Sequence, residues 1–263
     1  MIKPNKLEQE DKIAIISLSM GVLGESFMTF QKELIEKRLN GFGLEVVYTP
    51  NALKGVAFLR DNPKKRAEDL KWVLEDDAIK GIFCIIGGDD TYKAIPYLIE
   101  DEVFINNVRK QPEIFMGYSD STINHLMFHK IGLITYYGHS AIVDFGELNE
   151  GILPYSKMWF EKLFKSEKLT KITSSPMWYY ERTTFGETEF GKDRMSKVEE
   201  KGYEVLQGTG VVSGKLFGGC VESLSELLSG GRYGDEADVN SKINLFPFLQ
   251  EFEGKILFLE TSE

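Results

Sequence analysis

A serine in the middle of the chain stands where a strand is expected to turn into a helix. The apolar residues Ile114–Met116 precede the segment Gly117–Ser121, which reads Gly-Tyr-Ser-Asp-Ser, and the helix-like stretch Thr122–His129 follows. A serine on such a turn is pushed out of the sheet toward solvent, in the geometry called a nucleophile elbow. The sequence therefore predicts that Ser119 is a nucleophile. The alternative is a tight connection between a strand and a helix.

Backbone N–H groups that could stabilise an oxyanion are expected near this hydroxyl. The N–H of Asp120 follows Ser119 at the start of the helix. A second turn, Gly87–Thr91 (Gly-Gly-Asp-Asp-Thr), follows the apolar run 81–86, and its glycines let a ligand approach the backbone closely. We expect this turn to supply half of an oxyanion hole. The alternatives are a kinase-like phosphate turn, which the charge of Asp90 disfavours, and a tight turn with an aspartate helix cap.

A serine nucleophile needs a base, usually a histidine that a carboxylate orients. Of the three histidines, His125 and His129 lie on the helix that leaves the elbow, where a rise of about 1.5 Å per residue carries them away from Ser119. His139 follows a strand-like run and could reach the same sheet edge, or it is a loop histidine. Glu260 ends the last apolar strand, where it either orients an imidazole or is a solvated strand end.

The elements around these residues alternate between strand and helix. Buried strands are expected where runs of apolar residues occur, and helices where apolar residues recur at helical spacing. This alternation predicts an α/β fold with an open parallel sheet and a site at the carboxyl ends of its strands. The strands are expected at 12–18, 44–48, 81–86, 114–116 and 133–137, and the helices at 27–42, 66–75, 92–98 and 122–129.

The character of the chain changes after about residue 165. We expect three parts: an α/β domain over 1–165, a linker with an aromatic loop over 166–207, and a smaller domain over 208–263 with strands at 211–216 and 255–260. Little chain follows the last apolar strand to cover it, and we therefore expect the smaller domain to be truncated.

Composition excludes several classes of partner. The 263 residues carry a net charge of −10, which argues against binding to nucleic acid or to an anionic membrane. Two cysteines suggest neither a disulfide framework nor a zinc cluster, and we expect no metal. The sequence shows neither an export signal nor a run of apolar residues long enough to span a bilayer, so a cytoplasmic protein is expected.

The order of the motifs resembles the LD-carboxypeptidase family of serine peptidases, which includes the muramoyltetrapeptide carboxypeptidases. It is most similar to the branch that contains the microcin C self-immunity proteins, and it spans essentially the whole chain. The resemblance implies an N-terminal flavodoxin-like or Rossmann-like domain that carries the serine and a β-rich C-terminal domain, apparently truncated here. The motifs are Gly87–Thr91, Gly117–Thr122, Tyr136–Gly138, Gly218–Gly219 and Ile256–Glu260.

The resemblance also implies roles for individual residues. Ser119 corresponds to the nucleophile, Glu260 to the carboxylate that orients the histidine, and the N–H groups of Gly88 and Asp120 to the oxyanion donors. The family's histidine lies in a Gly-His motif beyond the Phe-Leu-Glu strand, so we expect this chain to lack its general base. Cys220 stands where the family usually has asparagine, which puts recognition of a substrate carboxylate in question.

The sequence thus predicts a serine hydrolase that needs no cofactor. Its substrate is expected to be a murein tetrapeptide, cleaved at the L,D peptide bond to release D-Ala. The alternatives are a self-immunity hydrolase that cleaves the amide bond of a peptidyl- or aminoacyl-nucleotide, and a binding module without catalysis. We assign substrate contacts to Asp89, Trp178 and Tyr180, and the resemblance implies a homodimer.

Overall fold

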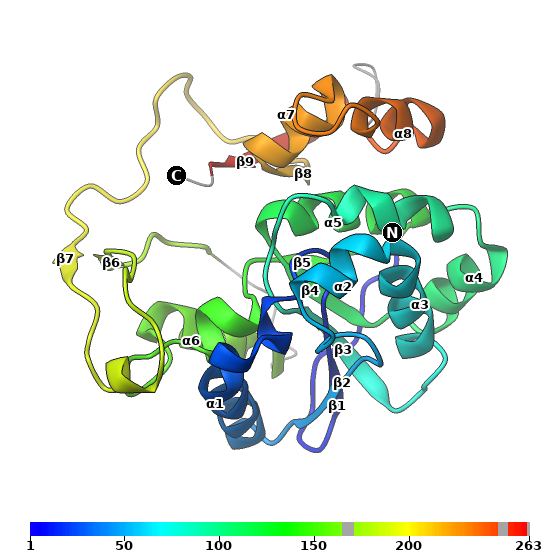
Figure 1. Cartoon of the computed structure of the whole chain (residues 1–263). Coiled ribbons are helices and arrows are strands. Elements are labelled where there is room, and N and C mark those ends of the chain that lie inside the picture. Colours follow the sequence, from blue (N-terminus) through cyan, green and yellow to red (C-terminus); the bar gives the residue numbers. More distant parts are fainter. Residues whose placement is uncertain (165–170, 247–251, 262–263) are drawn as a thin grey trace.

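The computed structural model describes residues 1–164, 171–246 and 252–261. Its centre is a five-stranded sheet with the order β2-β1-β3-β4-β5, and every neighbouring pair is parallel (Figure 1). The predicted α/β fold with an open parallel sheet is therefore confirmed. The strands are β1 (Lys12–Ile16), β2 (Glu45–Tyr48), β3 (Ile79–Cys84), β4 (Ile114–Gly117) and β5 (Tyr136–Tyr137).

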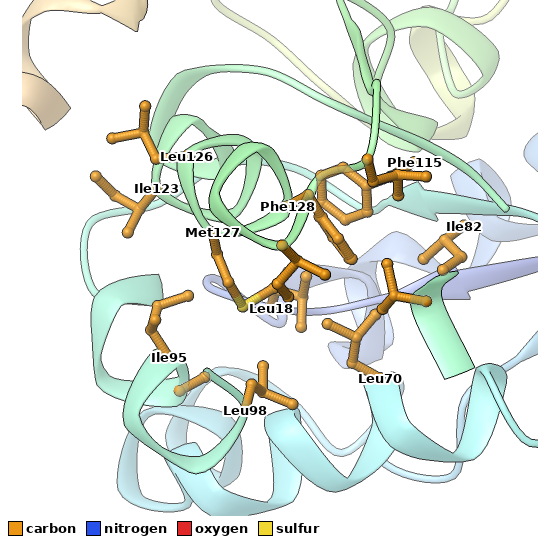
Figure 2. Close-up of a cluster of buried hydrophobic side chains, with 14 of the residues drawn as sticks. Leu18, Leu70, Ile82, Ile95, Leu98, Phe115, Ile123, Leu126, Met127 and Phe128 are labelled. Atoms are coloured by element: carbon orange, nitrogen blue, oxygen red, sulfur yellow. The ribbon is translucent and has the colours of Figure 1, made fainter. Parts of the chain in front are cut away.

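Side chains of the central strands alternate between two buried clusters. In β1, Ala14 and Ile16 belong to one cluster, and Ile13 and Ile15 belong to the other. Because both faces of the sheet are covered, most residues of the central strands are apolar, and charged residues such as Lys12, Glu45 and Lys80 lie at or near the strand starts. Figure 2 shows the first cluster, in which helical side chains meet those of the sheet; its labelled residues are Leu18, Leu70, Ile82, Ile95, Leu98, Phe115, Ile123, Leu126, Met127 and Phe128.

Helices lie on both faces of this sheet. Buried residues of α1 (Thr29–Gly41) and α6 (Pro154–Glu161) belong to the second cluster, while those of α3 (Pro63–Val73), α4 (Glu102–Lys110) and α5 (Thr122–Ile131) belong to the first. The sequence pattern did not predict α2 (Val56–Asp61), α4 or α6. The helix expected at 92–98 is instead a 3-10 helix over Thr91–Tyr97; it contains Pro96, which has no N–H to donate.

The order of the strands reverses direction at β1. β1 lies between β2 and β3, so the chain moves to one side of β1 and then returns to the other side. Loops at such a reversal diverge at the carboxyl ends of the strands, where α/β proteins bind ligands. Here the loop after β1 meets the turn after β3, since the N–H of Met20 donates to the carbonyl of Gly87 over 3.3 Å.

The C-terminal residues form a second parallel pair of strands, β8 (Lys215–Cys220) and β9 (Lys255–Glu260). The strand predicted at 211–216 was misplaced, since Val211 is 96% exposed and the strand runs on through Gly218. A Cβ at Gly218 would lie 1.8 Å from the carbonyl oxygen of Phe258, so this close pairing of strands requires glycine.

Two helices accompany this pair in the described residues, α7 (Val221–Ser229) and α8 (Glu236–Ile243), and Figure 1 shows them above α5. Leu224, Leu227 and Leu245 belong to the same buried cluster as α5. The C-terminal part therefore packs directly on the helix that leaves the elbow. The domain boundaries at 165 and 207 stay a prediction.

The segment expected to be a linker holds an antiparallel hairpin of β6 (Met177–Tyr179) and β7 (Ser196–Val198). In Figure 1 this hairpin lies beside the central sheet, beyond α1 and α6. Across the described ranges, no helix combines the length and the apolar character needed to cross a membrane.

Candidate active site

Ser119 lies on the strand-to-helix turn that the sequence predicted. It follows β4, opens a short 3-10 helix over Ser119–Ser121, and this helix runs directly into α5. Its φ is +59°, in the left-handed region that residues other than glycine seldom occupy. Such strained backbone is concentrated at functional sites, and it is the conformation that lifts a nucleophile out of a sheet.

The Gly87–Gly88 turn lies directly against Ser119. A Cβ at Gly87 would be 2.9 Å from Ser119 Oγ and 3.2 Å from the backbone nitrogen of Asp120. Gly88 has a φ of +152°, and a Cβ there would be 2.2 Å from Ser19 Oγ. Only glycines therefore allow this approach of the backbone to the serine. An oxyanion hole built from the N–H groups of Gly88 and Asp120 requires this proximity.

The carboxylate of Asp120 holds the loops around the elbow together. It is buried, and its Oδ2 accepts the N–H of Thr91 over 2.9 Å. Burial raises the pKa of Asp120, while hydrogen bonds from Ser19 and Thr91 oppose this rise. Ser19 Oγ also accepts the N–H of Asp89 over 3.1 Å. The loops after β1, β3 and β4 thus meet at Asp120, and the pattern of the sequence did not indicate Ser19.

The two aspartates of the glycine turn differ in what they contact. Asp90 is buried and binds Arg66, whose Nη1 lies 2.6 Å from Asp90 Oδ1. The repulsion of phosphate that the sequence predicted for Asp90 is therefore offset by the guanidinium, which corrects that part of the argument against a kinase. Asp89 forms a hydrogen bond with Tyr233. Its assignment as a substrate-binding residue stays a prediction.

Glu260 reaches the elbow through the side chain of Tyr137. The Tyr137 hydroxyl donates to Glu260 Oε1 over 2.6 Å and accepts the N–H of Ser119 over 3.1 Å. It also lies 3.2 Å from Thr122 Oγ1. Burial and the neighbouring carboxylate raise the pKa of Tyr137, so the hydroxyl keeps its proton at neutral pH. Sequence patterns assigned Tyr137 to a motif but no role, because an aromatic residue on a strand usually reads as packing.

The end of β8 rests on the start of α5. The N–H of Cys220 donates to Thr122 Oγ1 over 3.0 Å, and a Cβ at Gly219 would lie 2.5 Å from the same oxygen. The thiol of Cys220 donates to Glu222 Oε2 over 3.1 Å. Cys220 is also the register partner of Glu260 in the β8–β9 pair. The ends of both C-terminal strands are therefore held near the elbow.

Each of the three histidines has partners away from the Ser119 hydroxyl. His125 Nε2 donates to the carbonyl of Gly117 over 3.0 Å, and its Nδ1 lies 2.7 Å from Thr135 Oγ1. Burial lowers the pKa of His125 to about 4. His139 Nε2 donates to the carbonyl of Ser156 over 2.8 Å, and the ring of His129 packs edge-on against Phe217. The expectation that neither helical histidine serves the serine agrees with these contacts, and the identity of the base stays a prediction.

Trp178 and Tyr180 form an aromatic pair on the β6–β7 hairpin. Their ring centroids lie 4.9 Å apart, and Lys197 Nζ lies 5.3 Å from the first and 5.4 Å from the second. Both rings are about two-fifths exposed. In the described part of the chain, no hydrogen bond or ring contact joins them to the elbow. Their role in binding substrate stays a prediction.

These features define a class of protein: a parallel α/β fold with a serine elbow at the carboxyl edge of its sheet. The model of the LD-carboxypeptidase N-terminal domain matches residues 13–138. A crystal structure of an MccF-like protein from Streptococcus pneumoniae in complex with AMP is 43% identical, with a TM-score of 0.92, and the match covers 97% of this chain and 74% of that one. The chain belongs to the LD-carboxypeptidase family, in its MccF-like branch.

Curated relatives point to the same family. A probable murein peptide carboxypeptidase of Bacillus subtilis is 29% identical over 133 residues, and the microcin C7 self-immunity protein MccF of Escherichia coli is 28% identical over 203 residues. These matches cover 50% and 76% of the present chain. The chain spans 40% of the length of the first relative and 52% of the second.

Proposed function

We propose that the protein is a serine hydrolase of the LD-carboxypeptidase type that cleaves the L,D peptide bond of a murein tetrapeptide and releases D-Ala. The observation that carries this proposal is the setting of Ser119. This residue has a positive φ, lies against the Gly87–Gly88 turn, and is joined through Tyr137 to the carboxylate of Glu260. Membership of the family supports the same reaction class.

In the proposed reaction, Ser119 Oγ attacks the carbonyl carbon and a tetrahedral intermediate forms. The N–H groups of Gly88 and Asp120 stabilise its oxyanion. Cleavage of the peptide bond leaves an acyl-enzyme, the amine of D-Ala departs with the proton taken from the serine, and water then releases the acyl group. The family resemblance assigns the proton transfers to a histidine that follows the strand ending at Glu260, and Glu260 would orient its ring.

A second candidate reaction is cleavage of the amide bond of an aminoacyl-nucleotide. The specific observation in its favour is the exposed pair Trp178 and Tyr180, because aromatic faces with a nearby cation such as Lys197 suit a nucleobase and its phosphate. The MccF-like structure from Streptococcus pneumoniae, which holds AMP, supports this candidate. The same serine would carry out the attack in both reactions.

Mass spectrometry of reaction products separates these candidates. The protein is incubated with a murein tetrapeptide and with an aminoacyl-sulfamoyl adenosine. Release of D-Ala alone would support the first candidate, and cleavage of the nucleotide conjugate alone would support the second. Tight binding by calorimetry without any product would instead indicate a binding module and would contradict the hydrolase.

The matched variant for this experiment is Ser119→Ala. We expect turnover to fall by about 10³-fold or more, since the nucleophile is lost while binding groups remain. The control is Ser225→Ala, which removes a hydroxyl from the exposed side of α7 and should leave turnover unchanged. Full activity in Ser119→Ala would show that the mechanism is wrong.

A further inference from the structure

We propose that Tyr137 is a positioning residue that holds the Glu260 carboxylate in register with the Ser119 elbow. This inference rests on the proposed function and adds a residue to its machinery. Tyr137 pairs with Gly117 on the neighbouring strand, so its side chain stands beside the turn that carries the serine. Its hydroxyl contacts the backbone of Ser119 and the side chain of Glu260 at the same time.

Tyr137 joins two parts of the molecule that do not share a sheet. Glu260 ends β9, which pairs only with β8 among the described strands, whereas Ser119 follows β4 of the central sheet. The ring of Phe258 packs edge-on against that of Tyr137, with centroids 5.2 Å apart. Both contacts fall on the last residues of β9. Tyr137 therefore links the Glu260 side chain directly to the serine turn, in addition to the contact of β8 with Thr122.

Each hydrogen bond around the Tyr137 hydroxyl has a defined donor and acceptor. An ionised carboxylate only accepts hydrogen bonds, so the Tyr137 hydroxyl must give its proton to Glu260. Thr122 Oγ1 accepts the N–H of Cys220, and its own proton is then available to the Tyr137 oxygen. The oxygen also accepts the N–H of Ser119. The series ends on a charge, which makes its last hydrogen bond the strongest.

Removal of the hydroxyl would break this series at its centre. In Tyr137→Phe, the Ser119 N–H and the Thr122 hydroxyl lose an acceptor and Glu260 loses a donor, while the ring and its contact with Phe258 remain. The neighbouring Tyr136 provides a matched control. It packs against the cluster on the opposite face of the sheet, so Tyr136→Phe removes a hydroxyl from the same strand on the other side.

The first test is a double-mutant cycle with Tyr137→Phe and Glu260→Gln, measured as kcat and KM on the substrate that the product analysis identifies. We expect Tyr137→Phe to lower kcat about 10- to 100-fold with KM changed less than about threefold, and Tyr136→Phe to change neither. Because Tyr137 acts through Glu260, the double variant should lose little more than Glu260→Gln alone. The inference would be overturned if the kcat of the double variant fell by the product of the two single losses. It would also be overturned if Tyr137→Phe had the same kcat as Tyr136→Phe.

The second test needs no turnover and therefore separates this inference from the proposed function. Thermal unfolding is followed for the same variants. If Tyr137 links β9 to the elbow, the lowering of Tm in the double variant will be smaller than the sum of the two single effects. If the lowering of Tm in the double variant equals the sum of the two single lowerings, no link between Tyr137 and Glu260 exists. This outcome is independent of what Ser119→Ala reveals about catalysis.

Discussion

The elbow and the aromatic hairpin are held in place in opposite ways. Beside Ser119, Asp120 is 4% exposed and Thr122 is 0% exposed, and hydrogen bonds join this turn to Thr91, Tyr137 and Cys220. On the hairpin, Trp178 and Tyr180 remain 40% and 39% exposed. One part is fixed by many contacts, and the other presents its side chains to solvent.

A buried cluster of ion pairs attaches the hairpin segment to the α/β domain. The side chain of Glu147 is 1% exposed, and its two oxygens each lie 2.9 Å from the Nε of an arginine, Arg182 for one and Arg194 for the other. Both arginines belong to the segment that contains β6 and β7. The proposed nucleophile thus lies at the well-packed edge of the sheet, and a role of the exposed hairpin in the choice of substrate stays a proposal.

The largest effect on activity is expected from a change in the glycine turn beside Ser119. In Gly88→Ala, the new methyl group would meet Ser19 Oγ at 2.2 Å and the backbone nitrogen of Met20 at 2.9 Å, at a φ of +152°. We expect kcat/KM to fall about 100-fold, the effect of losing one oxyanion donor, because the N–H must move. Steady-state kinetics measures this loss.

The control for this variant is Gly132→Ala. Gly132 also has a positive φ, +107°, but among the described residues beyond its chain neighbours no atom lies within 4 Å of a Cβ placed there. It should lose some stability through backbone strain and keep its kcat/KM. Equal kinetic losses in both variants would show that strain in general, and not the oxyanion turn, limits catalysis.

A second variant tests how the hairpin is attached to the α/β domain. Glu147→Gln leaves Arg182 and Arg194 without their carboxylate, so we expect the segment from β6 to β7 to loosen. KM for a nucleotide conjugate should rise about tenfold while kcat changes less than about threefold, since binding is lost and not chemistry. Hydrogen exchange should report faster opening of the hairpin.

Glu189→Gln provides the comparison on the same segment. Its partner Lys192 is 61% exposed, and such surface pairs contribute about 0–1 kcal/mol. This variant should behave as the wild type in both measurements. If Glu147→Gln did so too, the attachment of the hairpin would not depend on the buried carboxylate.

The smallest effect is expected at the opposite end of β4, where Glu113 is buried just before the strand. Burial raises the pKa of Glu113 from 4.5 to about 7, so the folded protein retains a proton that the unfolded chain releases. Stability contributed by this group is therefore present below about pH 4.5 and is lost as the pH rises through 7. Glu113→Gln should gain about 1–3 kcal/mol at pH 8 and little at pH 4.

Chemical denaturation at both pH values measures this difference. The control is Glu100→Gln, which changes an exposed carboxyl and should leave the stability curve as it is. Activity should not change in Glu113→Gln, because the residue lies at the far end of the strand from Ser119. If Glu113→Gln raised the free energy of unfolding equally at pH 4 and pH 8, ionisation of Glu113 would not be the cause of the destabilisation.

Local signals in the sequence were sufficient for most of the parallel sheet. Continuous apolar runs such as 81–86 mark strands buried on both faces, and the alternation with helical patterns implies parallel pairing. The turn that carries Ser119 was also predicted, because an apolar strand, a small-residue segment and a helical pattern follow one another there. The position of β8 was predicted wrongly because paired glycines such as Gly218 and Gly219 are typical of turns. In the structure they lie within the strand, where the close approach of Phe258 and Thr122 leaves no room for a Cβ.

The sequence by itself determined the sheet, the turn that carries Ser119 and the glycine turn that could face it. Only the tertiary structure decided that Tyr137 joins Ser119 to Glu260, that Asp90 is neutralised by Arg66, and that Glu147 anchors the hairpin. The physical reason is the range of the interactions. Strand, helix and turn preferences act between neighbours in the chain, whereas these hydrogen bonds and ion pairs join residues between 18 and 123 positions apart. No local pattern encodes such pairings.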